Sequence, residues 1–276
     1  MEPIIEVVDL QHIYPTGTHA LRGVNIKIYP GEYVAIIGQN GSGKTTFVRH
    51  LNGLLRPTQG IVRVNGIDVS KRKVSEMARI VGYCFQNPDH QIFCDTVYQE
   101  VAYGPKNLGL DQAEIDRRVE EALDAVGMSH LKDMHPRDLS KGQRQRVAVA
   151  SVLSMHPTIL IVDEPTTGQD YRDGMEMLEL ISRLNQQGHT ILFITHDMPM
   201  VARFAQRVIV FRDGEVLLDG TTREVFHQVE ILRTTFLEPP QITTLAYNLR
   251  DYFPDTLLSV SEMVEKTLEI LKQKQT

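Results

Sequence analysis

Long apolar runs, an excess of positive charge and internal repeats are all missing from this chain. No apolar run approaches the roughly 18 residues that a membrane-spanning helix needs. The N-terminus, Met1–Pro3, does not open a basic segment followed by an apolar stretch, so we expect no signal peptide. The formal net charge is −6. This charge argues against a nucleic-acid partner, because neutralising phosphates requires clustered Lys and Arg.

What is present is ordinary for a globular protein. Hydrophobic residues make up 42% and charged residues 23% of the 276 residues. A chain of this length can bury a substantial core, as one large domain or as one domain with an appendage.

The octapeptide GQNGSGKT, at residues 38–45, follows the apolar run 33–37 and precedes a predicted helix at 46–51. Strand, glycine-rich turn and helix form the context of a phosphate-binding loop, in which backbone N–H groups and the helix dipole face one anion. Lys44 supplies a charge for the β- and γ-phosphates and Thr45 a hydroxyl for Mg²⁺. The predicted ATP-binding residues of this loop are Gly38, Gln39, Asn40, Gly41, Ser42, Gly43, Lys44, Thr45 and Thr46.

A second apolar run, 159–162, ends in Asp163 and Glu164. Two acids at the carboxyl end of a strand in an open α/β sheet face the ligand crevice. Asp163 fits a role in holding Mg²⁺, usually through water, and Glu164 fits a role in orienting or deprotonating an attacking water.

Cysteine is scarce. Cys84 and Cys94 could pair only in an oxidising compartment, whereas a protein with a phosphate-binding loop works where ATP and reduced thiols are found. We therefore expect free thiols.

The order of predicted elements indicates an α/β fold. Antiparallel strands are expected at 4–10, 24–29 and 61–64, and further strands at 81–85, 158–162, 190–194 and 207–211. The runs 158–162 and 190–194 are apolar almost throughout, as expected of parallel strands covered on both faces. Helices are expected at 111–126, 143–155 and 173–187. Asp111 and Glu114 can form a capping box at the first of these helices. Residues from about 87 to 157 are mostly helical and interrupt the α/β pattern, which predicts a helical subdomain inserted into a nucleotide-binding core.

The tail after residue 222 has a different character. It contains Pro239 and Pro240 and then an amphipathic helix, whose capping box would be Ser259 with Glu262. The apolar stripe of this helix is Val264, Leu268 and Leu271. The stripe could pack on the protein's own core or form a dimer contact, and the sequence leaves both open.

The segment Leu139–Gln143 reads LSKGQ, and with the phosphate loop and the acidic strand it resembles the ATP-binding cassette (ABC) ATPases, whose signature is LSGGQ. The resemblance implies a P-loop NTPase of the ABC ATPase fold: a RecA-like core, an antiparallel β subdomain, an inserted helical subdomain and here a small C-terminal extension. It also implies that Ser140, Gly142 and Gln143 contact the ATP of a second ABC ATPase chain. Lys141 departs from the pattern. It could add charge near a phosphate, point to solvent or weaken the composite site.

Four further residues or segments acquire roles through this resemblance. Gln86 resembles the glutamine that reaches Mg²⁺ and the attacking water, and His196 the switch histidine that contacts the γ-phosphate. Tyr14 resembles the aromatic residue that stacks on adenine. Gly168–Asp170 resembles the D-loop at the dimer seam, with Gln169 where leucine is commoner.

Within that family the chain looks most like the ATPases of energy-coupling factor (ECF) transporters, through the segments 85–93, 97–104 and 237–241. This resemblance implies an ATP-binding and ATP-hydrolysing subunit that works as a homo- or heterodimer on the cytoplasmic face of the cell membrane. Its other partners would be a transmembrane scaffold and a small substrate-binding membrane subunit that imports a vitamin or a transition-metal ion.

The expected division is a nucleotide-binding domain at 1–222 and an extension at 223–276. The alternatives are the ATPase of a conventional ABC transporter, a soluble ABC protein without a transport role, and a regulatory ATP-binding module.

Overall fold

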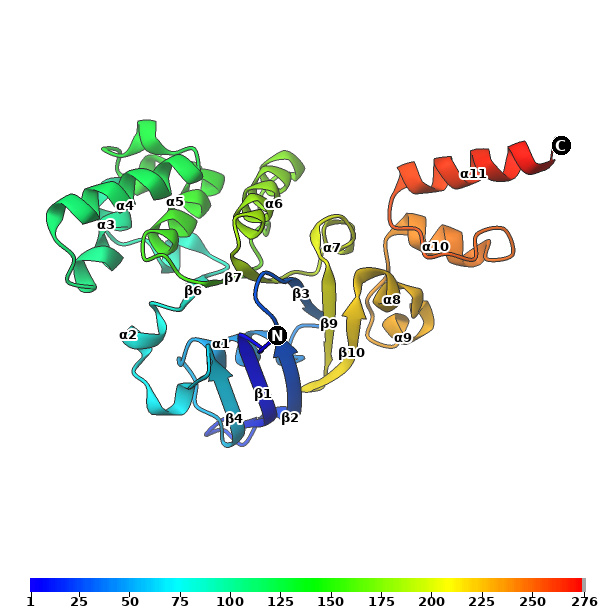
Figure 1. The fold of residues 1–276 in the computed structure, drawn as a ribbon, viewed down its shortest axis with the longest axis horizontal. Coiled ribbons are helices and arrows are strands. Elements are labelled where there is room, and N and C mark those ends of the chain that lie inside the picture. The colour runs from blue at the N-terminus through cyan, green and yellow to red at the C-terminus, as the bar shows by residue number, and fades with distance from the viewer. Residues whose placement is uncertain (275–276) are drawn as a thin grey trace.

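Residues 1–274 of a computed structural model of this chain are described here, and they form two sheets flanked by helices (Figure 1). The larger sheet has six strands in the order β10-β9-β3-β8-β7-β6, all parallel except β10. Its strands are β3 (Tyr33–Gly38), β6 (Val81–Cys84), β7 (Ile159–Asp163), β8 (Thr190–Ile194), β9 (Arg207–Arg212) and β10 (Glu215–Thr221). Every residue of β3, β6, β7 and β8 is buried, because both faces of the sheet are covered.

The smaller sheet is antiparallel, in the order β2-β1-β4-β5. Its strands are β1 (Ile5–Ile13), β2 (His19–Ile28), β4 (Gln59–Val64) and β5 (Ile67–Asp68). A buried apolar cluster joins it to helix α1 (Lys44–Leu51) and to one face of the larger sheet, through residues such as Leu21, Phe47 and Ile161. The antiparallel strands expected from the sequence are therefore present, and β1 and β2 are longer than expected.

A group of helices lies between β6 and β7 in the chain and at one end of the molecule (Figure 1). It contains α3 (Val97–Asn107), α4 (Gln112–Ala125) and α5 (Lys141–Leu153), with 3₁₀ turns at Pro88–His90, Ser129–Leu131 and Pro136–Asp138. Helices α6 (Tyr171–Gln186) and α7 (Met198–Phe204) pack with this group in the second apolar cluster. Before β6 stand the 3₁₀ turn Val69–Lys71 and the short helix α2 (Val74–Met77).

The capping box expected at α4 is only half formed. The carboxylate of Asp111 accepts the N–H of Glu114 at 3.0 Å. The carboxylate of Glu114 instead pairs with Arg117 and Arg118, one turn further along the helix. Two guanidinium groups within reach compete successfully with one backbone N–H.

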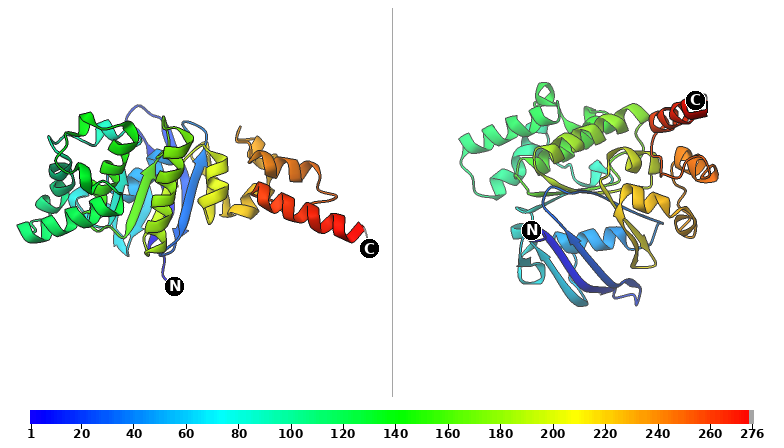
Figure 2. Two further views of the ribbon diagram at one scale, coloured as in Figure 1. Left: turned by 90° about the horizontal axis from the view of Figure 1, so that it is seen from above. Right: turned by 45° about the vertical axis from the view of Figure 1, so that its right-hand side comes forward.

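The tail divides into two parts. Helices α8 (Thr222–His227) and α9 (Val229–Arg233) belong to the core, since Phe226 and Leu232 are fully buried. Helices α10 (Gln241–Asn248) and α11 (Val260–Lys274) extend away from the sheets at the end opposite to α3–α5 (Figures 1 and 2).

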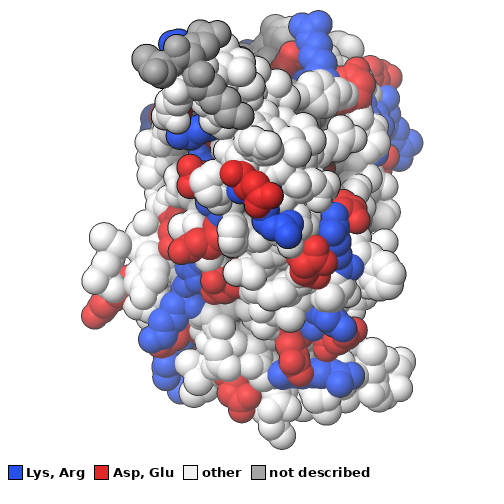
Figure 3. Space-filling view, turned by 90° about the vertical axis from the view of Figure 1, so that its right-hand side faces the viewer, with Lys and Arg blue, Asp and Glu red and all other residues white. Residues whose placement is uncertain are grey.

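The apolar stripe of α11 does not pack on the core. Val260 is 67% exposed, and Val264, Leu268 and Leu271 are 51–52% exposed. Ser259 accepts the N–H of Glu262 at 3.2 Å, whereas the carboxylate of Glu262 turns to Arg223 at 2.7 Å. On the face of the molecule that carries the C-terminal helices, acidic and basic side chains alternate with wide uncharged areas (Figure 3). No helix within residues 1–274 is long and apolar enough to span a bilayer.

Candidate nucleotide-binding site

A cavity of about 1130 Å³ opens where the carboxyl ends of β3, β7 and β8 meet. Parallel strands bring their carboxyl ends to one edge, so segments far apart in sequence converge there. Of the residues predicted from the sequence, the cavity is lined by Tyr14, Gly38, Gln39, Asn40, Gly41, Gly43, Lys44, Thr45, Thr46, Gln86, Asp163, Glu164 and His196. Ser42 is buried behind the loop, where its carbonyl accepts the N–H of Gly214 at 3.1 Å.

The loop 38–45 needs glycine at its turns. Gly43 caps α1 with φ +105°, and a β-carbon there would lie 2.8 Å from the carbonyl oxygen of Ala20. Such a backbone and such a contact exclude other residues. The Lys44 ammonium folds back over the loop and donates to the carbonyls of Gly38 at 2.7 Å and Gln39 at 2.8 Å. Burial lowers the pKa of Lys44, while the nearby charges of Glu164 and Asp163 oppose that shift.

Asp163 is held by a residue that sequence reasoning missed. The hydroxyl of Tyr83, from the adjacent strand β6, donates to Asp163 Oδ2 at 2.7 Å. Thr45 Oγ1 lies 3.5 Å from the same oxygen. Burial raises the pKa of Asp163, and the Tyr83 hydrogen bond opposes that rise. Only the pairing of β6 with β7 places Tyr83 beside this carboxylate.

Glu164 is surrounded by three polar side chains. Gln86 Nε2 and Thr167 Oγ1 each donate to Glu164 Oε2 at 2.8 Å. His196 Nδ1 lies 3.5 Å from Oε1. The fold thus brings together Gln86, Glu164 and His196 from three separate loops, and adds Thr167, which the sequence did not single out.

Tyr14 lies at the rim of the cavity, tied to the start of α1. Its hydroxyl and Thr46 Oγ1 are 3.0 Å apart, and its ring meets His12 edge-on, with centroids 4.6 Å apart. Phe236 and Leu237, from the C-terminal tail, also line the cavity. Phe236 is 84% exposed at φ +55°. No local sequence signal connects these two residues to a loop some 190 residues earlier in the chain.

The LSKGQ segment does not reach this cavity. Ser140, Gly142 and Gln143 lie at the N-terminus of α5, where Ser140 and Gln143 form a complete capping box. Lys141 does not point freely into solvent. Its ammonium donates to the carbonyl of Thr167 at 2.8 Å. Cys84 and Cys94 are both free thiols, as expected.

Known proteins resemble the chain over most of its length. Residues 21–167 match the ABC transporter family. EcfA, the energy-coupling factor transporter ATP-binding protein of Methanocaldococcus jannaschii, is 42% identical over 276 residues, covering 98% of this chain and 99% of that protein. EcfA of Methanothermobacter thermautotrophicus is 42% identical over 97% of this chain and 88% of that protein.

A protein of Caldanaerobacter subterraneus assigned to the ABC transporter ATP-binding proteins is 49% identical over 96% of this chain. The chain spans only 46% of the length of that relative.

Among solved structures, cbiO1 from Clostridium perfringens, part of the ABC transporter complex cbiONQ, superposes with a TM-score of 0.78. It is 40% identical, over 90% of this chain and all of that one. The dimeric ATP-binding cassette MJ0796, in a post-hydrolysis state with ADP and Pi, gives a TM-score of 0.71 at 29% identity, over 79% of this chain and 99% of that one. With the phosphate loop, the paired acids and the two-sheet architecture, these matches show that the chain belongs to the ATP-binding subunits of ABC transporters, in the group of the energy-coupling factor ATPases.

Proposed function

We propose that this chain is the ATP-hydrolysing subunit of an ECF-type importer, in which dimer closure and hydrolysis power uptake of a vitamin or transition-metal ion. The observation that carries the proposal is the end-to-end likeness to EcfA, at 42% identity over 98% of this chain and 99% of that protein. The likeness includes the C-terminal extension as well as the ATPase core. The cassette MJ0796, by contrast, covers 79% of this chain.

Proteins of this family bind ATP, and we assign the phosphates to the loop 38–46. The Lys44 ammonium is already desolvated and bonded to two loop carbonyls, so it can exchange those partners for phosphate oxygens. Tyr14 at the rim is suited to stacking on the adenine ring.

Thr45 and Asp163 fit a Mg²⁺ site. They place a hydroxyl and a carboxylate oxygen 3.5 Å apart. These are the hard oxygen donors that Mg²⁺ prefers, and Mg²⁺ commonly uses one or two protein ligands with substrate phosphates completing its shell. Bound there, Mg²⁺ would neutralise charge on the phosphates. Gln86 is within reach through its bond to Glu164.

We assign the attacking water to Glu164, as its orienting or accepting base, with His196 beside the γ-phosphate. The side chain of Glu164 is 15% exposed and anchored through one oxygen, Oε2, so Oε1 remains available on the cavity side, next to His196.

A second chain is needed to complete the site. Ser140, Gly142 and Gln143 stand at a helix N-terminus outside this cavity, so we propose that they contact ATP held by a partner ATPase. The exposed stripe of α11 is a second contact between the two chains. We propose residues 1–222 as the nucleotide-binding unit and residues 223–276 as an extension, in which α8 and α9 pack on the core and α11 assists dimerisation. Residues 275 and 276 lie outside the described residues.

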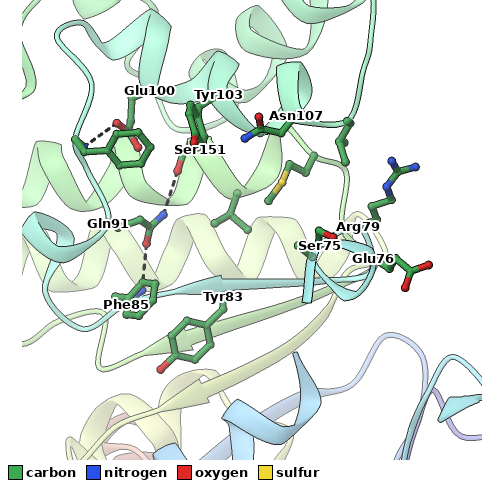
Figure 4. A pocket seen from close by; sticks show the side chains of 16 residues that line it. Ser75, Glu76, Arg79, Tyr83, Phe85, Gln91, Glu100, Tyr103, Asn107 and Ser151 are labelled. Atoms are coloured by element: carbon green, nitrogen blue, oxygen red, sulfur yellow. Dashed lines mark hydrogen bonds between the residues drawn. The ribbon is translucent and has the colours of Figure 1, made fainter. Parts of the chain in front are cut away.

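A second cavity, of about 730 Å³, lies between α2, β6 and the helices α3 and α5 (Figure 4). Phe93 and Tyr103 meet edge to face at its rim and are 64% and 48% exposed. Gln91 crosses its floor, bonding the N–H of Phe85 at 3.2 Å and Ser151 Oγ at 3.0 Å. We propose that the transmembrane scaffold docks here, because an exposed aromatic rim suits a protein partner.

Docking at this cavity would reach the ATP site by a short route. Gln91 bonds Phe85, the residue before Gln86, and Gln86 donates to Glu164. A scaffold on this groove would hold the protein at the cytoplasmic face of the membrane, with substrate choice left to the small membrane subunit.

Affinity purification of the chain from native membranes, with mass spectrometry of its partners, tests this proposal. We expect a multi-span scaffold, a small separate membrane protein and a second or identical ATPase chain. Partners drawn only from soluble proteins would contradict the transport role. In parallel, Lys44→Ala should abolish tight ATP binding in equilibrium titration, and an unchanged affinity would contradict the assignment of the loop.

A further inference from the structure

Two positions at which this chain departs from the family pattern bond to the same loop. Lys141 stands where the signature has a second glycine, and Gln169 where the D-loop commonly has leucine. Gln169 Nε2 donates to the carbonyl of Pro165 at 2.9 Å, and Lys141 Nζ donates to the carbonyl of Thr167 at 2.8 Å. The loop 165–169 is thus tied from inside by Gln169 and from α5 by Lys141.

The Lys141 side chain is packed against the loop. It is half-buried, and its ammonium lies so close over Gly168 that a β-carbon there would displace it. Gly168 itself has φ +72°. A charged donor on a backbone carbonyl makes a stronger bond than a neutral one. The glycine of the LSGGQ pattern has no side chain with which to make this contact.

The residue held by Lys141 also contacts the proposed base. Thr167 Oγ1 donates to Glu164 Oε2 at 2.8 Å, and the Thr167 N–H donates to the Glu164 carbonyl at 3.2 Å. Fixing the Thr167 backbone therefore restricts where its hydroxyl, and with it the Glu164 carboxylate, can lie.

We infer that Lys141 is a positioning residue: through the Thr167 carbonyl it fixes the loop 165–169, so that the Thr167 hydroxyl holds Glu164. The inference rests on the proposed role of Glu164. Because Lys141 lies between Ser140 and Gly142, it also links the segment that meets the partner's ATP to the carboxylate that serves the chain's own ATP. A movement of Ser140–Gly142 on contact with the partner's ATP then shifts Thr167 and alters the neighbouring site.

Amide hydrogen exchange on the full-length, nucleotide-free protein tests the contact directly. Lys141→Met should speed exchange in peptides covering residues 164–170 by roughly threefold to tenfold, since one charge-assisted bond holds the loop. Lys141→Arg, which keeps a charged donor, should stay near the wild-type rate. The matched control is Lys132→Met, which removes the same charge from an exposed site on the helical region. Unchanged exchange in Lys141→Met, or an equal rise in Lys132→Met, would overturn the inference.

A double-mutant cycle in the assembled, membrane-bound complex tests the route to Glu164. Lys141→Met and Thr167→Val should each lower kcat several-fold with little change in the KM for ATP, and the double variant should be no slower than Thr167→Val alone. Thr167→Ser retains the hydroxyl and should remain active. The inference would be overturned if the loss of kcat in the double variant equalled the product of the two single losses. It would also be overturned if Lys141→Met left kcat unchanged or raised it. If the wild-type complex hydrolyses no ATP, the proposed function fails, while the exchange result still decides whether Lys141 fixes the loop.

Discussion

The backbone of Glu164 adopts a conformation that glutamate rarely takes. Its φ is +46°, in the left-handed region. Such a residue persists where its surroundings over-determine it. Here its N–H donates to the Ile194 carbonyl at 2.9 Å, and its carboxylate is fixed by Gln86 and Thr167. The strained backbone of Glu164 therefore costs conformational free energy, and it directs this side chain into the cavity.

Glu164→Gln should keep ATP binding and lower turnover by roughly 10²–10⁴-fold, because an amide cannot accept the proton of water. Phosphate release and equilibrium ATP titration measure the two effects, and the variant should accumulate as a closed, ATP-bound dimer. The control is Glu120→Gln, an exposed glutamate on α4 that should hydrolyse ATP normally. Near-normal turnover in Glu164→Gln would rule out the proposed role.

Beneath the nucleotide loop lies a buried pair of histidines. His50 is fully buried; its Nε2 lies 3.1 Å from His12 Nδ1 and its Nδ1 2.7 Å from the Thr46 carbonyl. Burial lowers the pKa of His50 to about 4. The neutral form is therefore the one that the folded protein accepts.

Stability should depend on pH through His50. Its folded pKa of about 4 lies below the ordinary value of 6.5, so its contribution is complete above pH 6.5 and is lost as pH falls toward 4. The slope approaches about 1.4 kcal/mol per pH unit, or about 3 kcal/mol in all. Urea unfolding at pH 7, 5.5 and 4.5 measures the free energy of unfolding. The excess of the wild type over His50→Asn in this free energy should become smaller as the pH falls. Against an exposed control, His130→Asn, the advantage should stay constant. A constant difference for His50→Asn as well would contradict the assignment.

At the scale of the element, α11 has an apolar stripe that is about half exposed to solvent. Val264, Leu268 and Leu271 recur on one face, and each is about half exposed in the single chain. Exposed leucines at this spacing suit a second helix. Of the two interpretations that the sequence left open, the exposure argues against packing on the protein's own core, and the dimer contact stays a prediction.

Leu268→Lys should weaken self-association at least tenfold, because a dimer buries two copies of Leu268 at about 1.5–3 kcal/mol each. Sedimentation at several protein concentrations measures this. Glu269→Gln changes the net charge equally on the opposite face of α11 and should not alter association. If both variants associate like the wild type, the stripe of α11 does not form the dimer contact.

Most of the fold could be predicted from local patterns. The apolar runs predicted as strands form β7 and β8 and are buried throughout. The loop 38–45 lies between β3 and α1, as predicted from the strand and helix patterns on either side of it. Contacts made through tertiary pairing could not be predicted. Tyr83 reaches Asp163 only because β6 lies beside β7, and Phe236 reaches the nucleotide loop only because the tail folds back. The two capping boxes are half formed for a related reason. Glu114 and Glu262 form ion pairs with arginine side chains, namely Arg117, Arg118 and Arg223.

At the scale of the whole molecule, the proposed composite site assigns the two functional parts of one chain to two different ATP sites. The phosphate loop and Glu164 lie in one cavity, while Ser140 lies outside it on α5. Two copies related by a two-fold axis form an isologous interface, in which the phosphate loop of each chain meets Ser140 of the other and two equivalent sites result.

This division predicts complementation. Lys44→Ala and Ser140→Arg should each abolish hydrolysis alone, because every site then lacks one half. If the chain pairs with itself, mixing the two variants in equal amounts should recover roughly a quarter of the wild-type rate. Half of the dimers then contain one copy of each variant, and each of these dimers has one intact site of two. Phosphate release after mixing and re-equilibration measures it. Full activity of Ser140→Arg alone would contradict the composite site, and two copies of Lys44→Ala supply the matched negative control.

The location of Ser140 outside the chain's own ATP cavity has a consequence for cell economy. With the composite site as proposed, a chain that has not yet paired with a second ATPase chain can bind ATP but lacks the signature segment that completes its site, so it should not hydrolyse ATP. ATP hydrolysis would then begin only after two ATPase chains have paired, which ties ATP consumption to assembly.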